Sequence, residues 1–303
     1  MFPFLKERDI AISLSSIQIV RGLITDMKIQ PNLFLKEALL FGATLALGLF
    51  VAYQYIELLP RIEIIESASI TIGDIIGLVI VFITIWLISR IPRLVGWMFW
   101  IFISMVVLSG SQIVIASVAP FPVDIVGSLL LLTIFLMVHN VIVHDTAIVL
   151  AIAGIGAAVG IMITPMIGVL VLVALSFYDI IAVYKTKHMV RMAESMISSG
   201  AVFGFIIPSS FSNFMASRHE AKSRIGRDFM ILGSGDIGLP LIFASSLVRQ
   251  SLPEAIIVAG FIMLGLLLTH ILFVSQSKRQ PMAALPPIAT MALIGYVVAL
   301  LII

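Results

Sequence analysis

Two aspartates lie inside apolar stretches of this sequence, where an ionisable side chain is costly. Asp179 lies within VLVALSFYDIIAVY, and Asp236 lies within FMILGSGDIGLPLIF. Burying a charged carboxylate in hydrocarbon is expensive, so an ionisable residue at membrane depth is first considered as a functional residue. The structural alternative is a polar contact between helices, in which a Ser or Tyr hydroxyl satisfies each carboxyl group.

A pair of neighbouring carboxyl groups can catalyse hydrolysis. Two such groups a few ångströms apart cannot both ionise easily, so they share a proton and titrate as a unit. One then serves as the base for a water molecule, and the other as the acid for a carbonyl oxygen or a leaving amine. All 18 Lys and Arg residues fall at segment boundaries or in loops, so the best partner for Asp179 is Asp236.

The composition places both aspartates in a membrane protein. Of the 303 residues, 61% are hydrophobic and 11% are charged, and the mean hydropathy is +1.20. A soluble domain has about 45–50% apolar and about 25% charged residues. The chain has no cysteine, which excludes disulfides, thiol catalysis and zinc–thiolate sites.

Proline and charged residues divide the chain into nine apolar segments, and a membrane crossing needs about 20 residues. The sequence therefore predicts an all-α polytopic membrane protein with nine transmembrane helices. The segments are 38–59, 74–90, 95–118, 122–139, 145–163, 167–185, 228–249, 254–274 and 282–303.

The basic residues predict the orientation of these crossings. With nine crossings, every Lys and Arg except Arg61 and Arg249 falls on one side of the membrane. Basic residues are enriched in cytoplasmic loops, so we expect a cytoplasmic N-terminus and a C-terminus outside. The predicted parts are a cytoplasmic N-terminal segment (1–37), helices one to six (38–185), a cytoplasmic loop (186–227) and helices seven to nine (228–303).

The two aspartates are expected at similar depth in neighbouring helices. Asp179 lies six residues before Lys185 at the cytoplasmic end of helix six, or about 9 Å along the axis. Asp236 lies eight residues after Asp228, the expected start of helix seven, or about 12 Å. The remaining acids near segment starts are expected to cap helix N-termini. These acids are Asp74, Asp124, Asp145, Asp228 and Glu254.

The cytoplasmic loop contains three kinds of segment. Residues 188–199 (HMVRMAESMISS) have apolar side chains at helical spacing, which favours an amphipathic helix on the membrane surface. Residues 201–208 (AVFGFIIP) are typical of a short strand closed by Pro208. The polar residues 209–226 are expected to be flexible.

Two short motifs resemble the signature of presenilins and signal peptide peptidases, the GxGD intramembrane aspartyl proteases. They are Tyr178-Asp179 in helix six and Gly233-Ser234-Gly235-Asp236 in helix seven. The family's third motif, Pro-Ala-Leu, is represented by QPMAALPPIAT at the start of helix nine. There Ala284 and Leu285 fit and Pro286 follows, but Ala283 replaces the first proline.

The resemblance implies an intramembrane aspartic endopeptidase that cuts transmembrane-helix substrates. Asp179 and Asp236 would be catalytic. The residues implied in the motifs and in substrate positioning are Tyr178, Gly233, Gly235, Ala283, Ala284, Leu285 and Pro286. The predicted orientation is the presenilin one, and the small size and short loop resemble archaeal presenilin-type homologues.

The same resemblance implies the partners and the location. Substrates would be single-span membrane proteins or signal-peptide-like segments in the lipid bilayer of an archaeal plasma membrane, with no nucleic acid, cofactor or metal. In relatives, the segment before the GxGD helix pairs with an unwound substrate as a strand. Residues 202–208 (VFGFIIP) are expected to do so here, because an unwound helix needs new partners for its backbone.

Two other classes of function stay open. A proton-coupled transporter also keeps acids at membrane depth and uses helices broken by glycine and proline, although the sequence shows no corresponding broken segments in two halves. A catalytically silent scaffold for partner proteins is the third class. Zinc and serine proteases fit poorly, because His-Glu-x-x-His and Gly-x-Ser-x-Gly do not occur.

Overall fold

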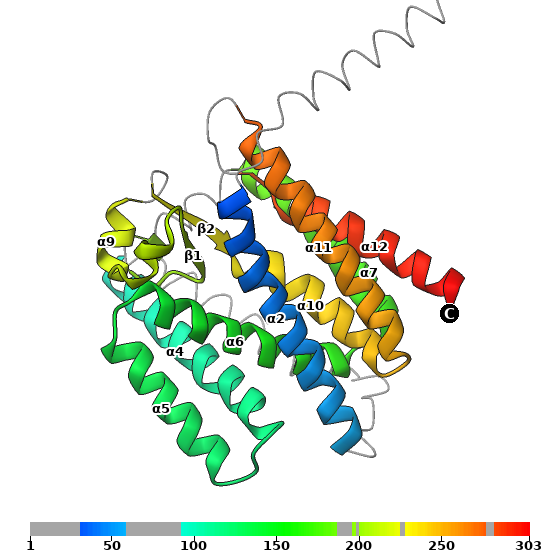
Figure 1. Cartoon of the computed structure of the whole chain (residues 1–303), viewed down its shortest axis with the longest axis horizontal. Coiled ribbons are helices and arrows are strands. Elements are labelled where there is room, and N and C mark those ends of the chain that lie inside the picture. Colours follow the sequence, from blue (N-terminus) through cyan, green and yellow to red (C-terminus); the bar gives the residue numbers. More distant parts are fainter. Residues whose placement is uncertain (1–30, 59–91, 187–195, 198–199, 225–227, 277–281) are drawn as a thin grey trace, which may run out of the picture.

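The chain forms a bundle of apolar helices with a small sheet at one end (Figure 1). The computed structural model describes residues 31–58, 92–186, 196–197, 200–224, 228–276 and 282–303. The segment predicted at 74–90 lies outside the described residues. So does almost all of the amphipathic helix expected at 188–199.

Eight of the nine predicted segments contain a long helix in the described residues. Six of these helices are long and apolar enough to cross a membrane, and α5 and α10 are shorter apolar helices. The expectation of a mostly helical, polytopic membrane protein is confirmed. The helices are α2 (Pro31–Leu58), α4 (Pro92–Ala116), α5 (Val123–Met137), α6 (Val141–Met162), α7 (Pro165–Ile180), α10 (Ser234–Val248), α11 (Leu252–Val274) and α12 (Leu285–Ile302).

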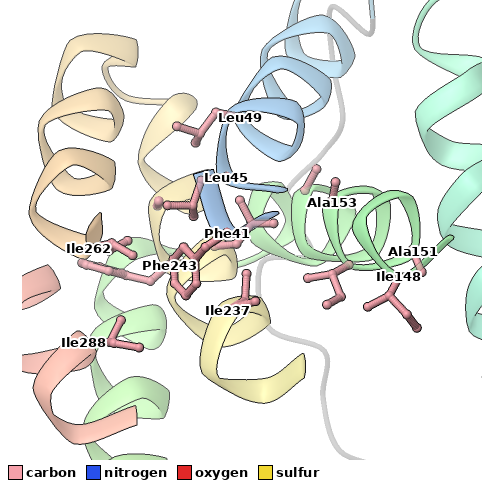
Figure 2. Close-up of a cluster of buried hydrophobic side chains, with 14 of the residues drawn as sticks. Phe41, Leu45, Leu49, Ile148, Ala151, Ala153, Ile237, Phe243, Ile262 and Ile288 are labelled. Atoms are coloured by element: carbon pink, nitrogen blue, oxygen red, sulfur yellow. The ribbon is translucent and has the colours of Figure 1, made fainter. Parts of the chain in front are cut away.

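Helices α6 and α10 lie at the centre of the bundle. α6 packs against α2, α4 and α10, and α10 packs in turn against α2, α7 and α11. α12 packs along α11 and also contacts α7 (Figure 1). Figure 2 shows the resulting apolar core, where Phe41 of α2 and Ile148 of α6 are drawn with Phe243 of α10, Ile262 of α11 and Ile288 of α12.

Small residues allow the two central helices to approach closely. A Cβ placed on Gly160 of α6 would clash with Ser245 and with the carbonyl of Ile242 on α10, and one on Gly156 would clash with Leu241. A Gly-x-x-x-Gly pattern in an apolar helix is typical of such packing. These two glycines therefore serve helix packing.

A two-stranded antiparallel sheet lies beside the start of α10. Strand β1 (Gly204–Pro208) pairs with strand β2 (Phe229–Gly233), with Gly204 opposite Gly233 and Pro208 opposite Phe229. The strand predicted before Pro208 is confirmed. The helix expected from residue 228 is wrong at its start, because residues 229–233 pair with β1 and α10 begins only at Ser234.

The polar segment after β1 is ordered, so its expected flexibility is wrong for residues 209–224. It forms a 3-10 turn, η2 (Phe211–Met215), and the short helix α9 (Arg218–Ser223). The backbone N–H of Arg218 donates to the His139 carbonyl at 2.6 Å, and its Nη2 donates to the Phe135 carbonyl at 2.9 Å. The guanidinium also lies 4.7 Å from the Phe135 ring centroid, and burial lowers the pKa of Arg218.

Candidate active site

Asp179 lies at the C-terminal end of α7, just before the backbone changes its helical geometry. Two residues further on, the chain continues as a π-helix, η1 (Ile181–Lys185). Single π-turns inserted in α-helices often occur at functional sites. The Asp179 side chain is only 4% exposed, and its Oδ2 accepts a hydrogen bond from the backbone N–H of Leu285 at 3.3 Å.

Asp236 lies in the first turn of α10, where Gly233 is the N-cap residue. Its partly buried carboxyl group hydrogen bonds to the backbone of Gly233. The N-terminus of a helix carries a partial positive charge that favours an acidic side chain. The expected depth of Asp236, eight residues into a helix, is therefore wrong: the residues before Gly233 are a strand, and Asp236 is the third residue of α10.

The two aspartates lie within electrostatic reach of each other. This follows from the packing of α7 against α10. Within the described part of the chain, neither carboxylate forms an ion pair with Lys, Arg or His. The arrangement therefore brings together two carboxyl groups without a compensating cation from the described residues.

The Pro-Ala-Leu-like segment lies directly against Asp179. Ala284 is the N-cap of α12, Leu285 is its first residue and Pro286 follows. Ala283 and Leu285 are buried, and the Leu285 N–H faces Asp179 as described above. The first N–H groups of a helix have no partner within that helix, so the start of α12 is free to supply a donor to the carboxylate.

Two motif residues are exposed. Tyr178 is 52% exposed on α7, and Gly235 is exposed next to Asp236. A Cβ added to Gly235 would meet nothing within 4 Å, whereas one added to Gly233 would lie 3.0 Å from Oδ2 of Asp236. Open space therefore adjoins Asp236 at Gly235, whereas a side chain at Gly233 would displace the carboxylate.

Both edges of strand β1 are occupied. β2 pairs along one edge, and His144 and Asp145 of α6 hydrogen bond to the other. Strand β1, within the stretch 202–208 that we expect to pair with a substrate, therefore presents no free edge in this structure. Asp145 is also not the N-terminal cap that we expected, because α6 begins four residues earlier, at Val141, and the carboxylate contacts the strand instead.

A group of buried polar residues in the membrane helices was not expected from the sequence. Lys36 and Glu37 belong to α2, because this helix begins at Pro31, seven residues before its predicted start at residue 38. Glu37 Oε2 lies 2.8 Å from Nδ1 of His270 on α11, and both side chains are almost fully buried. Charged residues at a helix end normally reach the membrane interface. The one sequence feature that argued against this position was that Lys36 and Glu37 are adjacent and border an apolar run.

Among the described residues, no group of three His, Asp or Glu side chains could hold a metal ion.

Fold and site together define a polytopic helical membrane protein in which Asp179, near the end of α7, and Asp236, in the first turn of α10, lie within electrostatic reach of each other. The family described as signal-peptide peptidase, presenilin aspartyl protease matches residues 62–303. The chain belongs to this family of intramembrane aspartyl proteases.

Two solved structures share the fold, and both are of a presenilin family intramembrane aspartate protease. The one in space group C222 is 20% identical, covers 87% of this chain and 95% of its own, and superimposes with a TM-score of 0.54. The one in space group P2 is 21% identical, covers 86% and 97%, and has a TM-score of 0.52. Among curated proteins, none matches the chain significantly. The matches support a protease and give no support to the transporter alternative.

Proposed function

We propose that this protein hydrolyses peptide bonds of transmembrane-helix substrates, with Asp179 and Asp236 activating a water molecule. The observation that carries the proposal is the packing of α7 against α10, which brings Asp179 near the end of one helix within electrostatic reach of Asp236 in the first turn of the other. Family membership supports the reaction type, and the positions of Asp179 and Asp236 on two packed helices support their assignment to it.

In the proposed reaction the two carboxyl groups share one proton. The ionised one removes a proton from water, whose oxygen attacks the scissile carbonyl carbon, while the protonated one donates its proton to the carbonyl oxygen. The tetrahedral intermediate then collapses, the C–N bond breaks, and the leaving amine takes up a proton from the dyad. The Leu285 N–H holds Asp179 in place throughout, and no cofactor is needed.

The substrate would bind as an added strand on β2. Residues of an antiparallel pair alternate between facing the partner strand and facing away. Ile206 faces away from β2, because its N–H donates to Asp145, and its partner Ile231 therefore faces the outer edge of β2. The outward backbone groups at Phe229 and Ile231 have no hydrogen-bond partner within the described residues. An unwound substrate can pair with them and continue past Asp236.

We propose nine crossings, with the N-terminus in the cytoplasm and the C-terminus outside. Six described helices have the length and composition for a crossing, and two shorter apolar helices join them. The distribution of Lys and Arg supports the orientation. The substrates would be single-span membrane proteins or signal-peptide-like segments in the cell membrane.

The test uses purified protein in detergent with a fluorescently labelled single-span substrate. Asp179→Asn and Asp236→Asn each keep the size of the side chain but cannot share the proton, so each is expected to abolish cleavage. Glu254→Gln, at the N-terminus of α11, is the matched control and is expected to keep wild-type activity. Wild-type rates in either Asp variant would refute the dyad, and solute uptake into liposomes without proteolysis would favour a transporter.

A further inference from the structure

Three polar side chains from the membrane helices hold the outer edge of strand β1. Nε2 of His144 lies 3.0 Å from the carbonyl oxygen of Gly204, and Oδ1 of Asp145 accepts the N–H of Ile206 at 2.9 Å. Nζ of Lys36 donates to the carbonyl oxygen of Pro208 at 2.8 Å. We call His144, Asp145 and Lys36 the edge clamp.

The edge clamp follows the spacing of a β-ladder. Gly204, Ile206 and Pro208 are alternate residues, so their outward backbone groups lie along a single edge of β1. β2 occupies the opposite edge with a continuous register from Gly204 to Pro208. β1 is therefore the middle element of a three-part ladder, in which side chains take the place of a third strand.

The clamp residues are buried, which makes their contacts specific. His144, Asp145 and Lys36 are each only 1% exposed. His144 can donate to a carbonyl only if Nε2 carries the ring proton. Lys36 also donates to the Ser209 carbonyl at 2.6 Å, and its ammonium lies 4.5 Å from the centre of the Phe211 ring. Buried polar atoms are expensive unless they are hydrogen bonded, so the bonds from Nε2 of His144, Oδ1 of Asp145 and Nζ of Lys36 hold the strand and the clamp together.

The clamp ties the sheet to two helices that pack against α10. Lys36 belongs to α2, and His144 and Asp145 belong to α6. Both helices pack against α10, whose first turn carries Asp236. β2 leads directly into this turn. A two-stranded sheet is only marginally stable by itself. The position of β2 relative to Asp236 therefore depends on the contacts that hold β1 in place.

We propose that the edge clamp sets the cleavage position by fixing the register of the sheet relative to Asp236. This inference rests on the proposed function, because it concerns a substrate strand added to β2. Strand residues rise roughly 3.4 Å each, and a strand keeps its side-chain faces only when it slips by two residues. A loosened sheet would therefore present bonds displaced by roughly 7 Å along the substrate. The clamp residues are positioning residues.

The test compares Asp145→Ala and Lys36→Met with Asp145→Asn, which keeps an acceptor oxygen for the Ile206 N–H. Thr146→Ala is the control, since Thr146 is exposed and its hydroxyl bonds only within α6, to the Ile142 carbonyl. Mass spectrometry of the products gives the cleavage sites, and hydrogen exchange of peptides spanning residues 204–208 reports the strand without any need for proteolysis.

For Asp145→Ala and Lys36→Met we expect at least tenfold faster exchange in β1, and additional cleavage at bonds two residues away from the wild-type site. KM should rise more than kcat falls. Asp145→Asn and Thr146→Ala should match the wild type. The proposal is overturned if exchange accelerates while the cleavage site stays unchanged, or if Asp145→Asn is as impaired as Asp145→Ala. A wild-type protein that cleaves no substrate would instead overturn the proposed function itself.

Discussion

The backbone N–H of Leu285 donates a hydrogen bond to Oδ2 of Asp179, across 106 positions of the chain. This contact joins the start of α12 to the end of α7. It assigns a physical task to the Pro-Ala-Leu-like segment, because a free N–H at a helix start can orient one carboxylate of the pair.

Removing this donor should slow the chemical step. Incorporation of the α-hydroxy acid analogue of leucine at position 285 replaces the N–H with an ester oxygen and keeps the side chain. A hydrogen bond to a charged group contributes about 1.5–3 kcal/mol, so kcat is expected to fall by roughly 10- to 100-fold. Steady-state cleavage assays measure the change.

Leu285→Ala is the matched control, because it removes the buried side chain but keeps the N–H. It should lower the thermal unfolding temperature and leave kcat less affected than the ester does. An ester variant with wild-type kcat would show that the contact has no role in catalysis.

Alanine substitutions at Gly233 and at Gly235 should have different effects on the kinetics of cleavage. A Cβ at Gly233 would lie 3.0 Å from Oδ2 of Asp236, so Gly233→Ala should displace the carboxylate and lower kcat. A Cβ at Gly235 would meet nothing within 4 Å, so Gly235→Ala should fold normally and mainly raise KM, because it narrows the space for a substrate. Kinetics and thermal unfolding of the two variants separate these effects. Equal effects on kcat would contradict the geometry.

The close approach of α6 and α10 predicts a stability effect far from the aspartates. Gly160→Ala would place a methyl group against Ser245 and the Ile242 carbonyl, and overpacking of this kind costs about 1–3 kcal/mol. The unfolding temperature should therefore fall. Gly260→Ala on α11 is the control, because a Cβ there meets nothing within 4 Å. If both variants unfold at the same temperature, helix packing does not require Gly160.

A shared proton predicts a bell-shaped dependence of cleavage on pH. At low pH both Asp179 and Asp236 are protonated and no base is available, and at high pH both are ionised and no acid is available. Each limb should change about tenfold per pH unit, and both limbs belong to the pair. Initial rates across mild acid to alkaline pH measure the profile, with Glu254→Gln showing the same limbs. A flat profile from mild acid to neutral pH would argue against a shared proton.

The sequence was sufficient to predict the helical membrane fold and to single out Asp179 and Asp236 as candidate residues. Apolar segments of helix length can be recognised without any tertiary information, and an acidic residue within such a segment is conspicuous. The close approach at Gly156 and Gly160 was also predictable, because their four-residue spacing places them on one helix face.

The start of α10 could not be predicted from hydrophobicity alone. A short apolar run such as FMILG fits a buried strand as well as a helix, and its partner β1 lies more than 20 residues away in sequence. With the helix predicted to start at residue 228, Asp236 was expected two turns inside it, whereas the structure places Asp236 in the first turn of α10. The expected depth of Asp236 was therefore wrong, and its catalytic pairing with Asp179 stays a prediction.

The edge clamp was hidden for a different reason. Lys36 lies near a helix start, where a charged residue normally reaches the aqueous interface, and Asp145 lay at an assumed helix start that the structure places four residues earlier. Their partners are backbone groups of β1. Backbone groups carry no sequence signal, so such contacts emerge only in three dimensions.

The most direct test is an experimental structure of the protein bound to a hydroxyl-containing transition-state analogue of peptide hydrolysis. The account predicts that the analogue's hydroxyl oxygen, which stands in for the attacking water, lies within hydrogen-bond distance of both the Asp179 and the Asp236 carboxylates. An analogue bound with its hydroxyl on only one carboxylate, or away from both, would contradict the dyad.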